Sequence, residues 1–155
     1  MTRPSWDEVW LQAAAVVAQR SLCSRAQVGA VITDTRHRII ATGYNNPPAG
    51  FNHGDVPCVN WCPRSLAGDT VLDREYDDCY ALHAEANALM AADRSTWQGG
   101  TIYVISDICF NCAKLIANSG LAQVIVKTDD TDRGYRASGK SYRFLRALDI
   151  EVVVL

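Results

Sequence analysis

The sequence predicts an α/β domain built around one mixed β-sheet. Strand and helix patterns alternate from residue 101 onward, and this order is typical of parallel strands joined by helical crossovers. Two β-branched runs at 28–33 and 38–42, separated by residues 34–37, predict an earlier hairpin. The hairpin would add antiparallel strands to the same sheet.

Local signals predict each element in turn. Ser5 and Glu8 form a capping box, and apolar residues at helical spacing follow Trp6, so we expect an amphipathic helix to about residue 20. Helical spacing resumes after His83 and continues to residue 92, and we expect further helices at 109–118 and 140–148. The remaining strands are expected at 101–105, 122–127 and 151–154. Residues 45–78 are rich in Pro and Gly with little periodicity, which predicts a long ordered loop.

Length and composition favour a single folded domain. A chain of 155 residues with 48% hydrophobic content can bury a core without disulfide bonds. We therefore expect one domain over residues 1–155, with residues 45–79 as a long insertion. Neither a signal sequence nor an apolar run of roughly 18 residues is visible, so we expect a soluble cytoplasmic protein without membrane contact.

The charge and cysteine content narrow the function classes. Fifteen basic and 17 acidic side chains give a net charge of -2, which argues against a surface built to grip nucleic acid but is compatible with a small anionic substrate. Six cysteines in a cytosolic chain of this size favour metal ligands or buried thiols over disulfides.

Four residues in two motifs indicate hydrolysis at a zinc ion. His83 precedes Glu85 by two residues, and Cys109 and Cys112 are spaced to place both sulfurs on one side of a helix N-terminus. One imidazole and two thiolates suit tetrahedral Zn²⁺ and leave a fourth position for water. Glu85 then remains as an unliganded carboxylate that can move protons.

Each of these residues also has a simpler interpretation. A CxxC can be a redox pair or two buried thiols, a His before a helix is often a cap, and Glu85 can simply complement the helix dipole. A redox CxxC, however, gives no reason for a His-x-Glu at the start of the preceding helix. The combination therefore favours a catalytic zinc site formed by His83, Cys109 and Cys112.

With these motifs, the chain resembles the cytidine and deoxycytidylate deaminase family over nearly its whole length, and its deoxycytidylate branch in particular. The matching stretches are CSRAQVGAVI at 23–32, GYN at 43–45, HAEANAL at 83–89 and CAKLIANSG at 112–120. The resemblance implies a three-layer α/β/α fold with a central mixed five-stranded sheet. It also implies a role in pyrimidine nucleotide metabolism and hydrolysis of dCMP to dUMP and ammonia.

The same resemblance implies roles for individual residues. His83, Cys109 and Cys112 would hold the zinc, and zinc-bound hydroxide would attack the amidine carbon of cytosine. Glu85 would shuttle the proton, while the amide of Ala84 and the side chain of Asn45 would hold the base and sugar. Ile108 departs from the family proline, where we expect an added N–H and a bulkier pocket wall. We expect zinc binding to survive this change, and base specificity to be open to a shift.

The resemblance also suggests a phosphate site. Residues 127–146 carry six basic and three acidic side chains. Tyr135 with Arg136 resembles a family Tyr-Arg pair near the substrate, and Arg25 is a second candidate. For Arg136 a solvated helix face is an equally good interpretation, and for Arg143 and Arg146 it is the better one.

Four cysteines remain for a second, structural zinc. We expect Cys58, Cys62 and Cys79 to bind it with either His53 or Cys23, and the alternative is a set of buried thiols. The resemblance further implies a homo-oligomer, a dimer or a hexamer, with Arg94 at a subunit contact. Control by dCTP or dTTP is left open, because Asn46 replaces a glycine of the effector-linked turn.

Three other functions share parts of this sequence pattern. The first is a deaminase acting on tRNA or single-stranded nucleic acid, against which the net negative charge argues. The second is a deaminase of free or modified cytidine nucleosides. The third is a zinc-stabilised interaction module without catalysis, for which Glu85 would be unnecessary.

Overall fold

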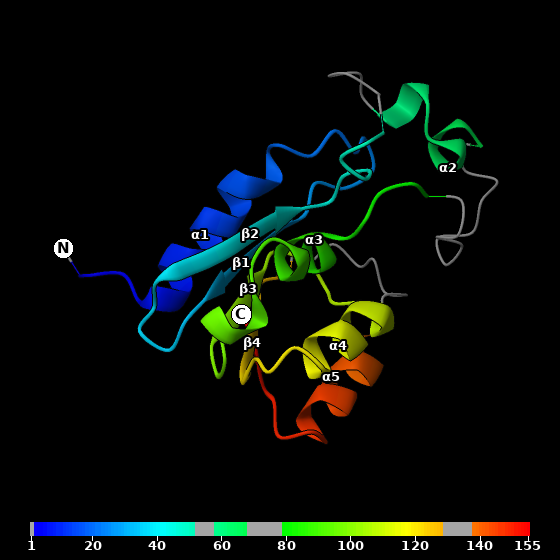
Figure 1. Ribbon diagram of the computed structural model, residues 1–155. Helices are drawn as coiled ribbons and strands as arrows, with labels where there is room; N and C mark the ends of the chain where they lie inside the picture. The colour runs from blue at the N-terminus through cyan, green and yellow to red at the C-terminus, as the bar shows by residue number, and fades with distance from the viewer. Residues whose placement is uncertain (1, 52–57, 68–78, 129–137) are drawn as a thin grey trace.

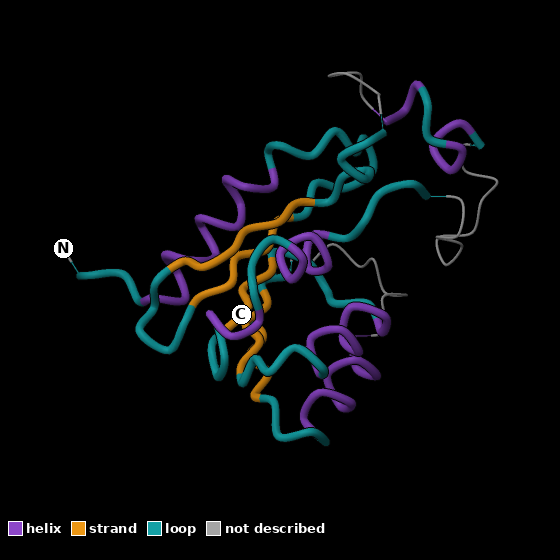
Figure 2. The backbone as a smooth tube through the Cα atoms, viewed as in Figure 1, coloured by secondary structure: helices purple, strands orange, loops and turns teal. Residues whose placement is uncertain are grey.

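The computed structural model describes residues 2–51, 58–67, 79–128 and 138–155. Within these residues, five strands form one sheet in the order β2-β1-β3-β4-β5. The strands are β1 (Gly29–Thr33), β2 (Ile39–Tyr44), β3 (Thr101–Val104), β4 (Gln123–Val126) and β5 (Glu151–Val154). β1 is antiparallel to β2 and β3, whereas β3, β4 and β5 are parallel. The predicted mixed five-stranded sheet is confirmed in the described residues, and Figure 2 shows its strands in orange.

Helix α1 (Trp6–Ala18) covers one face of this sheet (Figure 1). The predicted capping box starts it: the amide of Glu8 donates to Ser5 Oγ at 3.2 Å, and the amide of Ser5 donates to Glu8 Oε2 at 2.7 Å. Leu11 and Ala14 then pack against strand residues of the same face. This helix is the first of the three layers.

The other face carries α3 (Ala84–Met90), α4 (Phe110–Ala117) and α5 (Ser138–Arg146) (Figure 1). These helices enclose the larger hydrophobic core, which includes Ile32, Ile102, Val104, Val124 and Leu145. All five residues of β1 are buried, as expected for a central strand with helices on both faces. The N-termini of α3 and α4 carry the predicted metal ligands, so this layer positions the site.

The predicted hairpin between β1 and β2 turns on Asp34. The backbone amides of Arg36 and Arg38 each donate to Asp34 Oδ1 at 2.9 Å, and the Arg38 guanidinium donates to Oδ2 at 2.7 and 2.8 Å. These bonds, led by those from the Arg38 backbone, lower the pKa of Asp34 to about 2. The turn is therefore strongest when Asp34 is ionised.

The long segment after β2 is not simply loop. It contains a short 3₁₀ helix, η1 (Cys58–Asn60), and a four-residue helix, α2 (Pro63–Leu66). The amide of Cys58 donates to the carbonyl of Leu22 at 2.9 Å, which ties this part to the segment before β1. No helix in the described part of the chain is long and apolar enough to cross a membrane.

Candidate metal centre and active site

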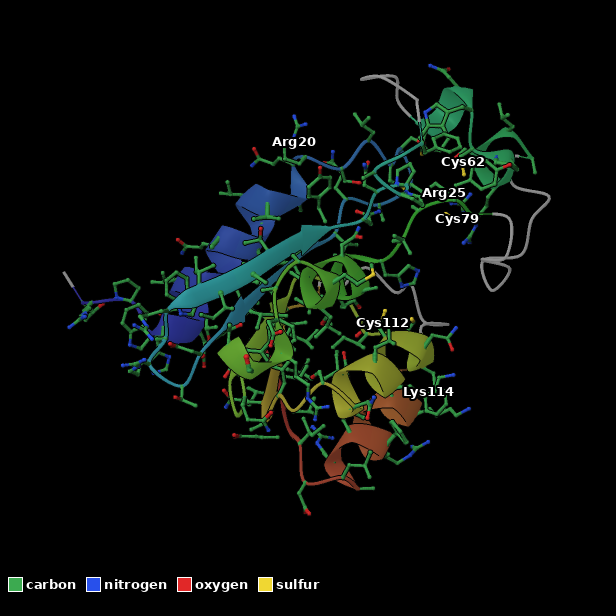
Figure 3. All side chains as sticks on the ribbon, in the orientation of Figure 1. Arg20, Arg25, Cys62, Cys79, Cys112 and Lys114 are labelled. Carbon is green, nitrogen blue, oxygen red and sulfur yellow. The ribbon has the colours of Figure 1, made fainter. Side chains whose placement is uncertain are left out.

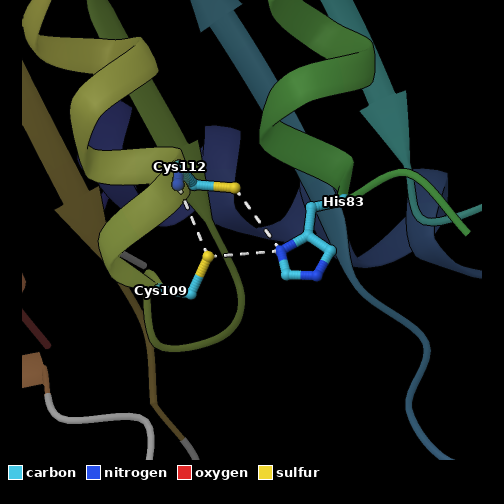
Figure 4. Close-up of side chains that lie close together, drawn as sticks. All are labelled: His83, Cys109 and Cys112. Carbon is cyan, nitrogen blue, oxygen red and sulfur yellow. Dashed lines mark hydrogen bonds between the residues drawn. The ribbon is translucent and has the colours of Figure 1, made fainter. Parts of the chain in front are cut away.

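Three predicted ligands converge at the ends of two helices. The Nδ1 atom of His83 lies 3.4 Å from the Sγ of Cys109 and 3.4 Å from the Sγ of Cys112 (Figure 4). Their ligand atoms all lie within 4.8 Å of one another. Within the described ranges no other group of three His, Cys, Asp or Glu side chains is that compact.

The N-termini of α3 and α4 position these side chains. His83 is the N-cap of α3 in extended backbone geometry, and its side chain makes no capping bond to the helix. Cys109 is the N-cap of α4, and its sulfur accepts a hydrogen bond from the amide of Cys112 at 3.4 Å. The ligands are therefore fixed by rigid helix ends.

The two sulfurs have unequal proton affinity. The Cys112 thiol, together with His83 and the Cys112 amide, lowers the pKa of Cys109 to about 4. The pKa of Cys112 is raised by the neighbouring Cys109 thiolate, by burial and by Glu85. One thiolate is thus already stabilised, and a bound cation would favour the second.

Glu85 lies beside this cluster without joining it. Glu85 is only 3% exposed, and this burial raises the pKa of its carboxyl group. Its carboxyl group contacts the Cys112 thiol. A buried carboxyl group with a raised pKa beside a candidate metal site is suited to accepting and returning protons.

A cavity of about 360 Å³ opens beside these three candidate ligands. This volume lies within the range of small-molecule sites. His83, Glu85 and Cys109 line it, and so do three of the residues predicted to bind substrate, namely Arg25, Asn45 and Ala84. Figure 3 shows Arg25 near Cys62 and Cys79, with Cys112 further along the molecule.

The side chain of Asn45 stabilises the fold through two hydrogen bonds to the backbone. Its Oδ1 accepts from the amide of Val28, and its Nδ2 donates to the carbonyl of Ala26, both at 2.8 Å. Each polar atom of the side chain keeps one further bonding position. A contact between Asn45 and a sugar therefore stays a prediction. In the structure this side chain stabilises residues 26–28, which lead into β1.

The four remaining cysteines line the same cavity as free thiols. Burial, and then the neighbouring Cys58, raises the pKa of Cys23. Burial, and then Cys62, raises the pKa of Cys79. Burial also acts on Cys58, but hydrogen bonds from Ser24 and Ser65 outweigh it and lower the pKa of that thiol. His53, the alternative ligand, lies outside the described residues.

Ile108 does not line the cavity as expected. Its side chain has no exposed surface and belongs to the main core. The neighbouring Asp107 lines the cavity instead, and its Oδ1 accepts a hydrogen bond from the hydroxyl of Tyr142 on α5 at 2.8 Å. The expectation of a bulkier pocket wall at position 108 is therefore wrong, because this side chain points into the core.

Sequence reasoning also missed Arg64. This residue of α2 is 3% exposed and lines the cavity. The only local signals were Cys62 and Pro63, which start a helix but do not show that the next side chain is buried. Among the other candidates, Arg94 is exposed at the start of η3 (Arg94–Thr96), and Tyr135 and Arg136 lie outside the described residues.

Comparison with known proteins decides the family. The model of the cytidine and deoxycytidylate deaminase zinc-binding region matches residues 4–128. The chain belongs to the cytidine and deoxycytidylate deaminase family. The converging ligands described above lie within the matched residues of this family.

Individual members of the deaminase family extend the likeness. The deoxycytidylate deaminase of Mycobacterium phage D29 is 43% identical over 129 residues, which cover 81% of this chain and 96% of that protein. The deoxycytidylate deaminase of Saccharomyces cerevisiae is 35% identical over 154 residues, 98% of this chain but 45% of that protein. The crystal structure of dCMP deaminase from the cyanophage S-TIM5, in complex with dCMP and dUMP, matches with a TM-score of 0.72 and 27% identity, and the match covers 100% of both chains.

Proposed function

We propose that this chain is a single-domain enzyme that hydrolyses dCMP to dUMP and ammonia. The observation that carries the proposal is the convergence of His83, Cys109 and Cys112 beside the buried Glu85 at one cavity. Relatives named deoxycytidylate deaminase supply the substrate class.

The donor set fits zinc. One imidazole nitrogen and two thiolates suit this cation, and a three-ligand protein site is typical of catalytic rather than structural zinc. When bound, zinc supplies a water activated for nucleophilic attack at neutral pH. Cys109, whose pKa is already lowered, favours the thiolate form needed for binding.

Glu85 acts as the general acid–base group. In the net reaction, water adds oxygen to the cytosine carbon that bears the amino group, and the bond from this carbon to nitrogen breaks. The Glu85 carboxylate takes a proton from the attacking water and gives it to the ring nitrogen. The carboxylate then takes the second proton, from the hydroxyl group now on this carbon, and gives it to the amino group, so that neutral ammonia leaves and the hydroxyl oxygen becomes the carbonyl.

Residues of the cavity wall would orient the nucleotide. The amide of Ala84 and the remaining bonding positions of Asn45 are available to the base and sugar. Arg25, also in the wall, would attract the phosphate. Tyr135 and Arg136 keep the same proposed role, although they lie outside the described residues.

We also propose a structural zinc on Cys58, Cys62 and Cys79 with Cys23, or with His53, as the fourth ligand. The contacts between Cys23 and Cys58 and between Cys62 and Cys79 support the four-cysteine set. Metal analysis of freshly prepared protein is expected to return two zinc ions per chain, falling to one in Cys62→Ser. One zinc in the wild-type protein would contradict this second site.

The assembly and its control are further proposals from the family likeness. The chain forms a homo-oligomer in the cytoplasm, with the exposed Arg94 at a subunit contact. Control by dCTP or dTTP needs its own test, because Asn46 replaces a glycine in the turn that the family links to effector binding. Sedimentation with and without each nucleotide measures both properties.

A screen for ammonia release tests the proposed function. The substrates are dCMP, CMP, deoxycytidine, their 5-substituted forms and an RNA hairpin. We expect the highest kcat/KM on dCMP. A higher kcat/KM on the RNA hairpin or on deoxycytidine would show that dCMP is not the preferred substrate. If the zinc-loaded protein released no ammonia from any of these compounds, a non-catalytic zinc module would be favoured instead.

A further inference from the structure

Arg64 is a buried cation in the wall of the active-site cavity. It is 3% exposed and lines the cavity that also contains His83, Glu85 and Arg25. A guanidinium group keeps its positive charge in proteins, and arginine is among the residue types least often fully buried. A positive charge in the wall of a cavity suits an anionic ligand.

Hydrogen bonds at Cys58 bring Arg64 to the same side of the cavity as Arg25. The amide of Ser24 donates to the Cys58 sulfur at 3.1 Å, and the hydroxyl groups of Ser24 and Ser65 each lie 3.5 Å from that sulfur. Arg25 directly follows Ser24, and Arg64 directly precedes Ser65. The two arginines are therefore neighbours of two serines that meet on one atom.

The acidic and the basic residues that line the cavity come from different segments of the chain. Its two carboxylates, Glu85 and Asp107, each lie two residues from a proposed zinc ligand. Its two arginines belong to the segment before β1 and to α2. In Figure 3, Arg25 lies on the α2 side with Cys62 and Cys79, apart from the zinc ligand Cys112.

We propose that Arg64 binds the 5′-phosphate together with Arg25 and makes the enzyme select nucleoside monophosphates over nucleosides. This inference rests on the proposed function, because it assigns the phosphate end of the same cavity. A guanidinium group matches two phosphate oxygens in one plane, and two such groups from different segments can clamp one phosphate. The insertion between β2 and α3 thereby becomes a specificity element.

Calorimetric binding of dUMP and of deoxyuridine tests the assignment without turnover. Arg64→Met is expected to weaken dUMP binding by roughly 10- to 100-fold and to leave deoxyuridine binding unchanged, since a charge-assisted phosphate contact has about that effect. Arg64→Lys is expected to recover part of the loss, because it restores charge without the planar pair of donors. The control is Arg20→Met, which removes an equal charge from the exposed turn that follows α1.

Zinc content and deoxyuridine affinity report whether each variant keeps its fold. Unchanged dUMP affinity in Arg64→Met would overturn the assignment, and an equal loss for dUMP and deoxyuridine would make Arg64 a structural residue instead. The proposed function fails differently: wild-type protein that binds dUMP but releases no ammonia from dCMP would contradict the reaction and leave the phosphate contact in place.

Discussion

Replacing Gly43 with alanine should displace α3 and the proposed catalytic residues at its N-terminus. An added Cβ would lie 2.2 Å from the carbonyl oxygen of Ala84 and 2.3 Å from the amide nitrogen of Ala88. Both are backbone atoms of α3, so β2 and α3 must separate by roughly 1 Å to restore ordinary contacts. The first turn of that helix carries Glu85, and His83 is its N-cap.

The expected effects of Gly43→Ala are about 1–3 kcal/mol of lost stability from overpacking and about a 100-fold lower kcat from displacement of the helix. Urea unfolding and ammonia release at saturating zinc measure the two quantities. Gly50→Ala is the matched control, because its Cβ would meet no atom within 4 Å. Gly43→Ala with wild-type stability and kcat would refute the close contact between β2 and α3.

Three further changes test other parts of the structure. Because the pKa of Asp34 is lowered to about 2, its contribution to stability is present above the ordinary carboxyl pKa of about 4 and is lost as the pH falls through 2. The difference in Tm between wild type and Asp34→Asn should therefore shrink between pH 5 and pH 2, and a constant difference would contradict this role. Tyr142→Phe removes the donor to Asp107, so we expect about 1 kcal/mol lower stability with zinc retained; unchanged stability would contradict a contribution from this hydrogen bond. Ile108→Ala should cost about 2–5 kcal/mol, as expected for a large side chain without exposure, while zinc content and base preference stay unchanged, and altered base preference would return Ile108 to the pocket wall.

The sequence predicted the parts of the fold that depend on local patterns. The capping box at Ser5, the β-branched runs and the alternation after residue 101 each mark an element, and all five strands lie where these patterns indicate. The proposed metal ligands could also be identified from the sequence, because His83 and Cys109 occupy helix N-caps within short motifs. In both cases the determining residues are close together in the sequence.

Features that depend on packing between distant parts of the chain could not be predicted from the sequence. Helix α2 has four residues, too few for a periodic pattern. The segment that contains the buried Arg64 is held by hydrogen bonds of Cys58 to Leu22 and Ser24, which are distant in the sequence. The partner of Asp107 lies on α5, 35 positions further along the chain. The direction of Ile108 likewise depends on how α4 and α5 meet the sheet.

The comparison of zinc-loaded wild-type protein with Glu85→Gln tests the central claim most directly. The amide keeps the size of the side chain but cannot carry the proton, and loss of a general acid–base group lowers rates by about 10²–10⁴-fold. We predict rapid conversion of dCMP to dUMP by the wild type, and a loss of this size in Glu85→Gln with the same zinc content. Equal rates in the two proteins at equal zinc content would contradict the account.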